Sequence, residues 1–327
     1  MKKKIFVSLA VLVLFFSISQ VFPAPGSVNK VLCTTFPVYQ ITRNVTVGVP
    51  GIQVELMIPA RLGCPHNYSL TPDDMRKIAS ADTLVINGLG MEEFLGAPLL
   101  RANPEIVTIN SSEGIGELLE FHHAEPEERP GDKVHREGDA HDSEAEEAGH
   151  DHNGINPHLF ASPRMAAKMA ANVAEGLSVI YPESAGIFRE NGHRYEVELN
   201  HLAEEFAVLP GRLINNRIVT QHGAFDYLAR DAGLEIVAVI NTQGGDSLSA
   251  AGIIRLVKRI RQTKAGAVFT EPQYPGRVGR AISVETGIPA GELDPVATGP
   301  DNAPLDYYEI VMRRNMKVLE DLLGARG

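Results

Sequence analysis

The regular alternation of short apolar runs with helical stretches constrains the fold of this chain more than any other feature. Eight runs, each bounded by turn residues, read as strands. They cover residues 30–35, 52–58, 82–88, 105–110, 215–221, 234–240, 265–271 and 288–294. Helical stretches lie between them, including 72–80, where Pro72 takes a first-turn position. This βαβ rhythm predicts an α/β fold of mostly parallel sheets with right-handed crossovers.

Two segments interrupt the rhythm. Residues 121–154 hold eleven Asp and Glu, three Lys and Arg, and six of the eleven histidines, with no apolar periodicity. Such a segment is expected to be a disordered, His-rich acidic loop. Residues 182–210, bounded by proline at both ends, read as one long helix, although interior glycines disfavour it. We therefore expect an N-terminal α/β lobe over 27–181, a linking helix over 182–208 and a C-terminal α/β lobe over 209–327.

The first residues have the layout of a secretory signal. Three lysines precede an apolar run from Ile5 to about Phe16, followed by small residues and prolines. The run is too short for an ordinary membrane span, so a signal peptide over 1–26 is favoured over an uncleaved anchor. Cys33 is a poor lipid-attachment site because Leu32 precedes it. We expect a soluble periplasmic protein, and the net charge of −11 excludes a basic nucleic-acid surface.

Cys33 and Cys64 are the two cysteines of the chain. In an oxidising compartment such a pair either bridges or remains as buried thiols or thiolate ligands. The sequence leaves these alternatives open, because it does not show whether the two Cα atoms lie close enough for a bridge.

Four residues that can bind a metal lie at strand-to-helix transitions. They are His66 in "GCPHNYSLTP", His158 in "NPHLFASP", His222 in "VTQHGAFDYL" and Asp294 in "GELDPV". Ligands of parallel α/β sheets gather at the carboxyl ends of the strands. Each residue alone is better explained as an ordinary structural one, but three imidazoles and a carboxylate together suffice for a tetrahedral divalent ion.

The motifs around these residues resemble one known family. They are "PHNYSLTP" with "ADTLVINGLGMEEFL", then "NPHLFASP", "QHGAFDYLARDAGLE", "FTEPQ", "AISVETGIPAGELDPV" and the terminal "YYEIVMRRNMKVLEDLL". In this order they are similar to the zinc- and manganese-type substrate-binding proteins of ABC importers, the ZnuA-like or TroA-like family. The likeness covers nearly the whole chain after residue 26.

The resemblance implies a fold and a function. The fold is two α/β lobes joined by a single long rigid helix, with the metal ion in the cleft between them. The implied ligands are His66, His158, His222 and Asp294. The implied function is capture of the ion and its delivery to a membrane permease with a cytoplasmic ATPase, by a protein that is not an enzyme and that we expect to be a monomer.

Zinc is the expected ion. Imidazole at position 222 suits zinc, whereas manganese-type members tend to have a carboxylate there. Mn²⁺ and Fe²⁺ remain alternative ions. The chain departs from the family pattern at Asn156, where an acid is usual, at Phe160, near which a Trp is usual, and at Cys64, whose position is usually polar or acidic. These departures bear on the residues that orient the ligands.

The His-rich loop has two interpretations. Its histidines either capture zinc weakly near the cleft or belong to a solvated spacer, and deletion of 121–154 distinguishes these. They are His122, His123, His135, His141, His150 and His152.

Other functions stay open beside import. A zinc hydrolase would keep three protein ligands and an open water position, which a fourth ligand argues against. A periplasmic zinc buffer or an adhesin is a further alternative. A sugar- or amino-acid-binding protein is disfavoured because the chain has no Trp and is only 6% aromatic.

Overall fold

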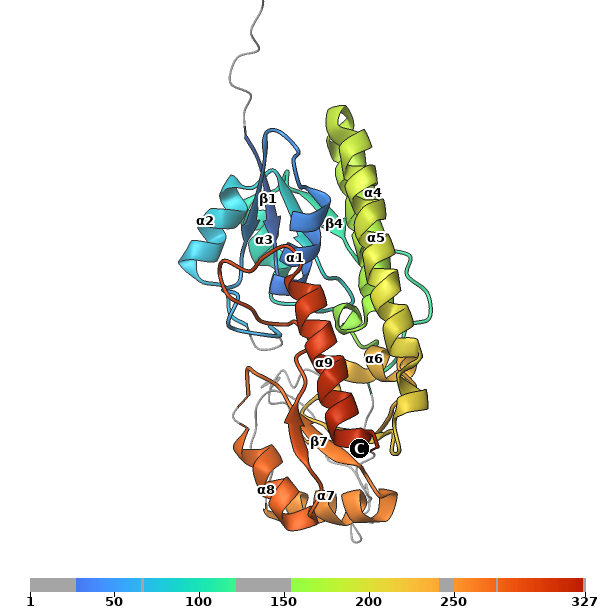
Figure 1. Cartoon of the computed structure of the whole chain (residues 1–327). Helices are drawn as coiled ribbons and strands as arrows, with labels where there is room; N and C mark the ends of the chain where they lie inside the picture. The colour runs from blue at the N-terminus through green and yellow to red at the C-terminus, as the bar shows by residue number, and fades with distance from the viewer. Residues whose placement is uncertain (1–27, 66–67, 122–153, 241–249, 275, 326–327) are drawn as a thin grey trace, which may run out of the picture.

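A computed structural model describes residues 28–65, 68–121, 154–240, 250–274 and 276–325. The described chain forms two lobes, each built on a four-stranded parallel sheet (Figure 1). The first sheet contains β1 (Asn29–Cys33), β2 (Ile52–Leu56), β3 (Thr83–Ile86) and β4 (Val107–Asn110). The second contains β5 (Arg217–Thr220), β6 (Glu235–Val239), β7 (Ala267–Thr270) and β8 (Ala290–Glu292). Seven of the eight strands lie within the runs that the sequence predicts, and β1 begins one residue before its run.

Both sheets have the same strand order, β2-β1-β3-β4 in the first and β6-β5-β7-β8 in the second. Side chains alternate between the two faces of each sheet, as the strand period of two requires. In β1, Val31 and Cys33 lie in the main core, whereas Leu32 packs into a separate cluster on the opposite face. In β5, Ile218 and Val219 divide in the same way. Both faces are covered by helices, so central strands such as β3 and β7 carry consecutive buried apolar residues.

Helices α1 and α4 pack on one face of the first sheet, and α2 and α3 on the other. In the second lobe α7 and α8 cover one face, while α6 and α9 pack against the main core. The helices are α1 (Phe36–Val45), α2 (Pro72–Ser80), α3 (Gly96–Ala102), α4 (Pro163–Ile180), α5 (Ala185–Ala207), α6 (Asp226–Asp231), α7 (Ala250–Thr263), α8 (Arg277–Thr286) and α9 (Tyr307–Leu323). Short 3₁₀ turns are η1 (Leu159–Ala161), η2 (Pro182–Ser184), η3 (Leu209–Arg212) and η4 (Gly223–Phe225).

The long helix α5 joins the lobes, in agreement with the expected linking helix. It packs along α4 and contacts α1 of the first lobe and α6 and α9 of the second. Gly192, whose presence disfavoured a helix on propensity alone, lies where a Cβ would stand 2.4 Å from that of Ala174 in α4. Packing therefore outweighs propensity here, because only glycine allows the two helices to approach so closely.

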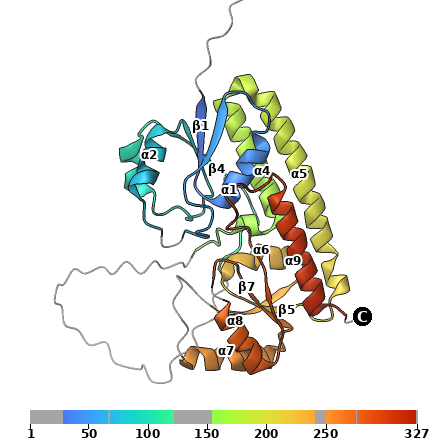
Figure 2. The same cartoon turned by 60° about the vertical axis from the view of Figure 1, so that its left-hand side comes forward.

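A second connection between the lobes lies in the segment before α9. Side chains of α1 bind its backbone, with Arg43 Nη1 donating to the Ala303 carbonyl at 2.7 Å and Asn44 Nδ2 to that of Leu305 at 2.9 Å. Figures 1 and 2 show α9 beside α5, reaching from this junction into the second lobe. The lobes are thus tied by the linking helix and by a returning segment of chain.

The structure leaves two sequence expectations untested and decides one open alternative. The signal peptide over 1–26 and nearly all of the His-rich loop lie outside the described residues. The bridge between Cys33 and Cys64 is not formed, since both are free thiols. Cys33 is buried in the core of the first sheet, whereas Cys64 lies beside His222 of the second lobe. No helix in the described ranges is long and apolar enough to cross a membrane.

Glu309, in the first turn of α9, is a buried acid whose Oε2 finds no hydrogen-bond partner among the described residues. Burial, together with the nearby carboxylates of Glu198 and Asp306, raises its pKa from 4.5 to about 7. The folded protein therefore holds this proton more tightly than the unfolded chain. Stability should fall as pH rises from about 4.5 to about 7, where the folded protein must bury the charge.

We expect Glu309→Gln to raise the free energy of unfolding at pH 8 by about 1–3 kcal/mol. The gain should vanish below pH 4.5, where the unfolded carboxyl is also protonated. Urea unfolding of both proteins at about pH 4 and about pH 8, on either side of the Glu309 titration, measures this change in the free energy of unfolding. Glu204→Gln, at an exposed position of α5, is the control, and an equal gain at both pH values would contradict the role of burial.

Candidate metal centre

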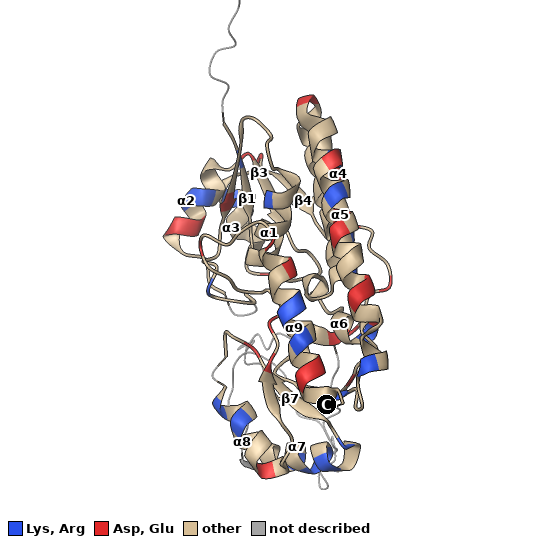
Figure 3. Cartoon of the chain, in the orientation of Figure 1, with Lys and Arg blue, Asp and Glu red and all other residues tan. Residues whose placement is uncertain are grey.

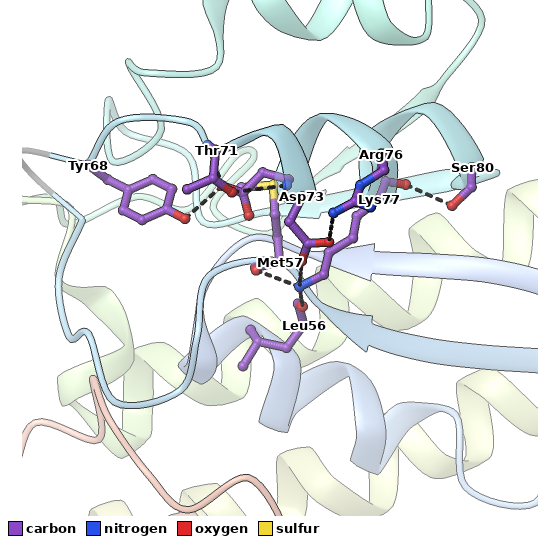
Figure 4. Close-up of polar contacts among 9 residues, drawn as sticks. Leu56, Met57, Tyr68, Thr71, Asp73, Arg76, Lys77 and Ser80 are labelled. Atoms are coloured by element: carbon purple, nitrogen blue, oxygen red, sulfur yellow. Dashed lines mark hydrogen bonds and ion pairs between the residues drawn. The ribbon is translucent and has the colours of Figure 1, made fainter.

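The segment between β2 and α2, which carries Cys64 and the predicted ligand His66, is fixed at both ends (Figure 4). Lys77 Nζ of α2 donates to the carbonyls of Leu56 and Met57, each at 3.0 Å. At the other end Thr71 and Asp74 form a capping box that starts α2. The Tyr68 hydroxyl donates to Asp74 Oδ2 at 2.7 Å. The loop therefore leaves the carboxyl end of β2 from a defined position.

Gly63 turns this loop toward the second lobe. Its φ of +78° lies in the left-handed region, and a Cβ there would stand 3.2 Å from Cγ of Gln273. Glycine allows both the turn and the close approach. The next residue, Cys64, is thereby held beside His222.

His158 lies at the start of η1, fully buried. Asn156 fixes its backbone and its ring, because Asn156 Oδ1 accepts the His158 N–H at 3.0 Å and lies 2.8 Å from ring Nδ1. An amide oxygen only accepts hydrogen bonds, so His158 Nδ1 must carry the proton. Nε2 is then the nitrogen with the lone pair that a metal requires.

The same asparagine binds the second lobe. Its Nδ2 donates to the Gly223 carbonyl and to Asp226 Oδ2, both at 2.7 Å. The Tyr227 hydroxyl donates to the Asn156 carbonyl at 2.8 Å. Asn156 stands where the family usually has an acid, yet in the structure this asparagine is the residue that orients His158. This network does contain an acid, Asp226, but it accepts a hydrogen bond from Asn156 instead of standing at position 156.

His222 follows β5 and is oriented by Glu271, which follows β7. Nδ1 lies 2.5 Å from Glu271 Oε1, while Gln273 Nε2 donates to Oε2 of the same carboxylate at 2.7 Å. Burial lowers the pKa of His222, but the Glu271 carboxylate and the hydrogen bonds with Cys64 and Glu271 outweigh this and raise it to about 10. A carboxylate on Nδ1 directs Nε2 toward a metal.

The two histidines meet between the lobes. Their ring centroids are 5.1 Å apart with planes at 84°. Among the described residues, Cys64, His158 and His222 form a group whose donor atoms all lie within 4.8 Å of one another. His66 lies outside the described residues, and so do the six loop histidines, so their roles stay predictions.

The structure does not bring Asp294 into this group. Its Oδ1 accepts the Val296 N–H at 2.8 Å, and its Oδ2 accepts from Arg314 at 3.0 Å. Figure 3 shows the basic residues of α9 near the junction of the lobes. Burial raises the pKa of Asp294 to about 6, although Val296 and Arg314 oppose this shift. The Asp294 carboxylate is therefore held by Arg314 of α9 and by the Val296 backbone.

Sequence reasoning missed Glu271 and Asp226 as supports, and it left Cys64 open as a bridged cysteine, a buried thiol or a thiolate ligand. Glu271 was within reach, because it follows a strand at the same edge of the sheet as His222 and stands in the motif "FTEPQ". Nothing local in the sequence pairs Cys64 with His222, since the two meet only through the packing of the lobes.

The sequence matches the family model described as ZnuA, the periplasmic component A of a zinc-uptake complex, over residues 31–322. The chain belongs to the ZnuA family. The family's two-lobed α/β architecture agrees with the two sheets and the helix that joins them.

Similar proteins carry related names. The chain is 30% identical over 306 residues to the zinc-binding lipoprotein AdcA of Streptococcus pneumoniae R6, covering 93% of this chain and 57% of that protein. It is 26% identical to the high-affinity zinc uptake protein ZnuA of Bacillus subtilis, covering 92% and 90%. It therefore spans little more than half the length of AdcA. A zinc-bound ZnuA deletion mutant shares the fold, with a TM-score of 0.72 and 20% identity, covering 92% of this chain and 100% of that one.

Replacing the carboxylate beside His222 should shift the titration of its ring. In metal-free Glu271→Gln we expect the pKa of His222 to fall from about 10 toward 6.5, because the amide carries no charge. In the wild type the charged ring contributes stability that is complete below pH 6.5 and is lost as pH rises through about 10. NMR titration of the imidazole protons in the presence of a chelator measures the shift.

Glu235→Gln, an exposed partner of Arg217, is the control and should leave His222 unchanged. An unaltered His222 midpoint in Glu271→Gln would show that Glu271 does not set the charge of the ring.

Proposed function

We propose that this protein binds Zn²⁺ between its lobes and delivers it to an ABC importer. The observation that carries the proposal is the pair of imidazoles from opposite lobes, His158 and His222, whose rings lie 5.1 Å apart. Each has Nδ1 occupied by a polar partner, Asn156 or Glu271, which directs Nε2 toward a shared ion.

His66 is the third proposed ligand, and the resemblance gives the fourth position to Asp294, which lies outside the described donor group. Imidazole donors suit zinc better than Mn²⁺, which prefers oxygen. A full set of protein donors leaves no coordination position for a reacting water, which favours binding and release over hydrolysis. The zinc names of the relatives and of the matched family support the same ion.

The partners follow from this proposal. A membrane permease and a cytoplasmic ATPase would receive the ion, and the leader over 1–26 would export the chain to the periplasm. The protein would act as a monomer, since both proposed halves of the site belong to one chain. The histidines between 122 and 152 would raise the zinc concentration near the cleft.

Metal analysis tests the function directly. We expect protein purified without added metal to hold about one zinc per chain, and competitive titration should show zinc preferred over Mn²⁺ by more than about 100-fold. Preferential retention of Mn²⁺ would overturn the choice of ion. Failure to bind any divalent ion, or zinc-dependent esterase or peptidase activity, would overturn the function itself.

Asn156→Ala should weaken zinc binding by about 10–100-fold, the usual effect of removing a partner that orients a ligating imidazole. The substitution frees the His158 ring and removes the bonds to Gly223 and Asp226. Titration against a chromophoric zinc chelator measures the loss. Asn172→Ala, whose amide binds Ser111 and Glu113 carbonyls away from the site, should keep full affinity; equal affinity in both variants would contradict the orienting role.

A further inference from the structure

Cys64 is the third member of the donor group that the structure assembles, and nothing in the function proposed above uses it. Its Sγ lies within 4.8 Å of a ring nitrogen of both His158 and His222. In a tetrahedral zinc site, with bonds near 2.3 Å to sulfur and 2.0–2.1 Å to nitrogen, adjacent donors are about 3.3–3.6 Å apart. The three donors therefore need shifts of only about an ångström to surround one ion.

The position of Cys64 follows from the packing of the lobes. Gly63 brings the loop against Gln273, two residues beyond Glu271, and the Gly299 N–H donates to the Ala60 carbonyl at 3.1 Å. Both contacts join the loop of the first lobe to the second. Cys64 is thus held at the junction where the two histidines meet.

The other cysteine has a different environment. Cys33 ends β1 in the apolar core, and burial raises the pKa of its thiol to about 12. It contacts no imidazole in the described donor group. A buried apolar thiol such as Cys33 is structural, whereas Cys64 lies among groups that bind metals.

The carboxylate expected at the fourth position is already engaged. Asp294 accepts from Arg314 and from the Val296 N–H, one on each oxygen. Coordination by Asp294 would require the ion to compete with these bonds. Cys64 lies within the donor group without such a rearrangement.

We propose that Cys64 coordinates the transported ion as a thiolate together with His158 and His222, in the fourth position that the resemblance gives to Asp294. The inference rests on the proposed metal-binding function. Binding releases the Cys64 thiol proton and the proton on Nε2 of His222 to solvent and forms metal–sulfur and metal–nitrogen bonds, without any change of oxidation state. A thiolate selects softer ions, so the site should favour Zn²⁺ and Cd²⁺ over Mn²⁺ beyond what imidazoles alone achieve.

Cobalt substitution tests the metal–sulfur bond directly. The metal-free chain, prepared under reducing conditions, is loaded with Co²⁺, and thiolate ligation appears as a strong sulfur-to-cobalt charge-transfer band in the near ultraviolet. We expect the band in the wild type, in Cys33→Ser and in Asp294→Asn, and not in Cys64→Ser. Zinc affinity of Cys64→Ser should fall by at least about 10-fold, with a smaller preference for zinc over Mn²⁺.

Each outcome decides the proposal. Co²⁺ binding without the band in the wild type, or a band that persists in Cys64→Ser, would overturn thiolate ligation while leaving the proposed function intact. If the wild type binds neither Co²⁺ nor Zn²⁺, the proposed function fails first. Because Cys64→Ser could perturb the fold, alkylation of the wild type is measured as well: zinc should protect Cys64 from iodoacetamide by more than about 10-fold, and an unprotected Cys64 in the zinc-loaded protein would overturn the proposal.

Discussion

The side-chain amide of Asn156 is the interaction on which the rest of the site depends. Its oxygen holds the His158 ring, and its nitrogen binds the turn after His222 through Gly223 and Asp226. One planar group therefore sets the tautomer of a histidine in the first lobe and the distance to the second. Leaving such buried groups unpaired would cost about 1–3 kcal/mol each, so the network favours a single arrangement of the two lobes.

This connection explains why the site can be built from loops. A linking helix alone would fix the relative orientation of the lobes only through packing along their sides. Small rotations of one lobe about that helix would then separate the donor atoms at the junction. The Asn156 bonds, the Tyr227 hydroxyl and the Gly63 contact act at the junction itself. The sheets supply rigid strand ends, and these cross-lobe bonds place the loops that follow them.

Periodicity and turn residues were sufficient to predict the strands, α2 and the linking helix, because each depends on a local pattern. The strand-end rule applies to His222, which follows β5, whereas His158 precedes η1 and meets His222 through the packing of the lobes. Gly192 shows where local reasoning misleads, since its helix-breaking tendency is outweighed by a contact with Ala174. Glu271 and Asp226 act through partners 49 and 70 residues away, and no spacing in one sequence shows such pairs. The sequence leaves the role of Cys64 open, because its neighbours His158 and His222 come close only when the two lobes pack together.

The choice of the fourth donor depends on a competition between charges. A metal ion attracts the Asp294 carboxylate, but Arg314 and the Val296 N–H already stabilise it. The Cys64 thiol has no arginine partner to lose; binding replaces its hydrogen bond with His222 by a bond to the ion and releases its proton. By binding Asp294, Arg314 favours coordination of the ion by the sulfur and imidazole donors, and such donors bias the site toward softer ions.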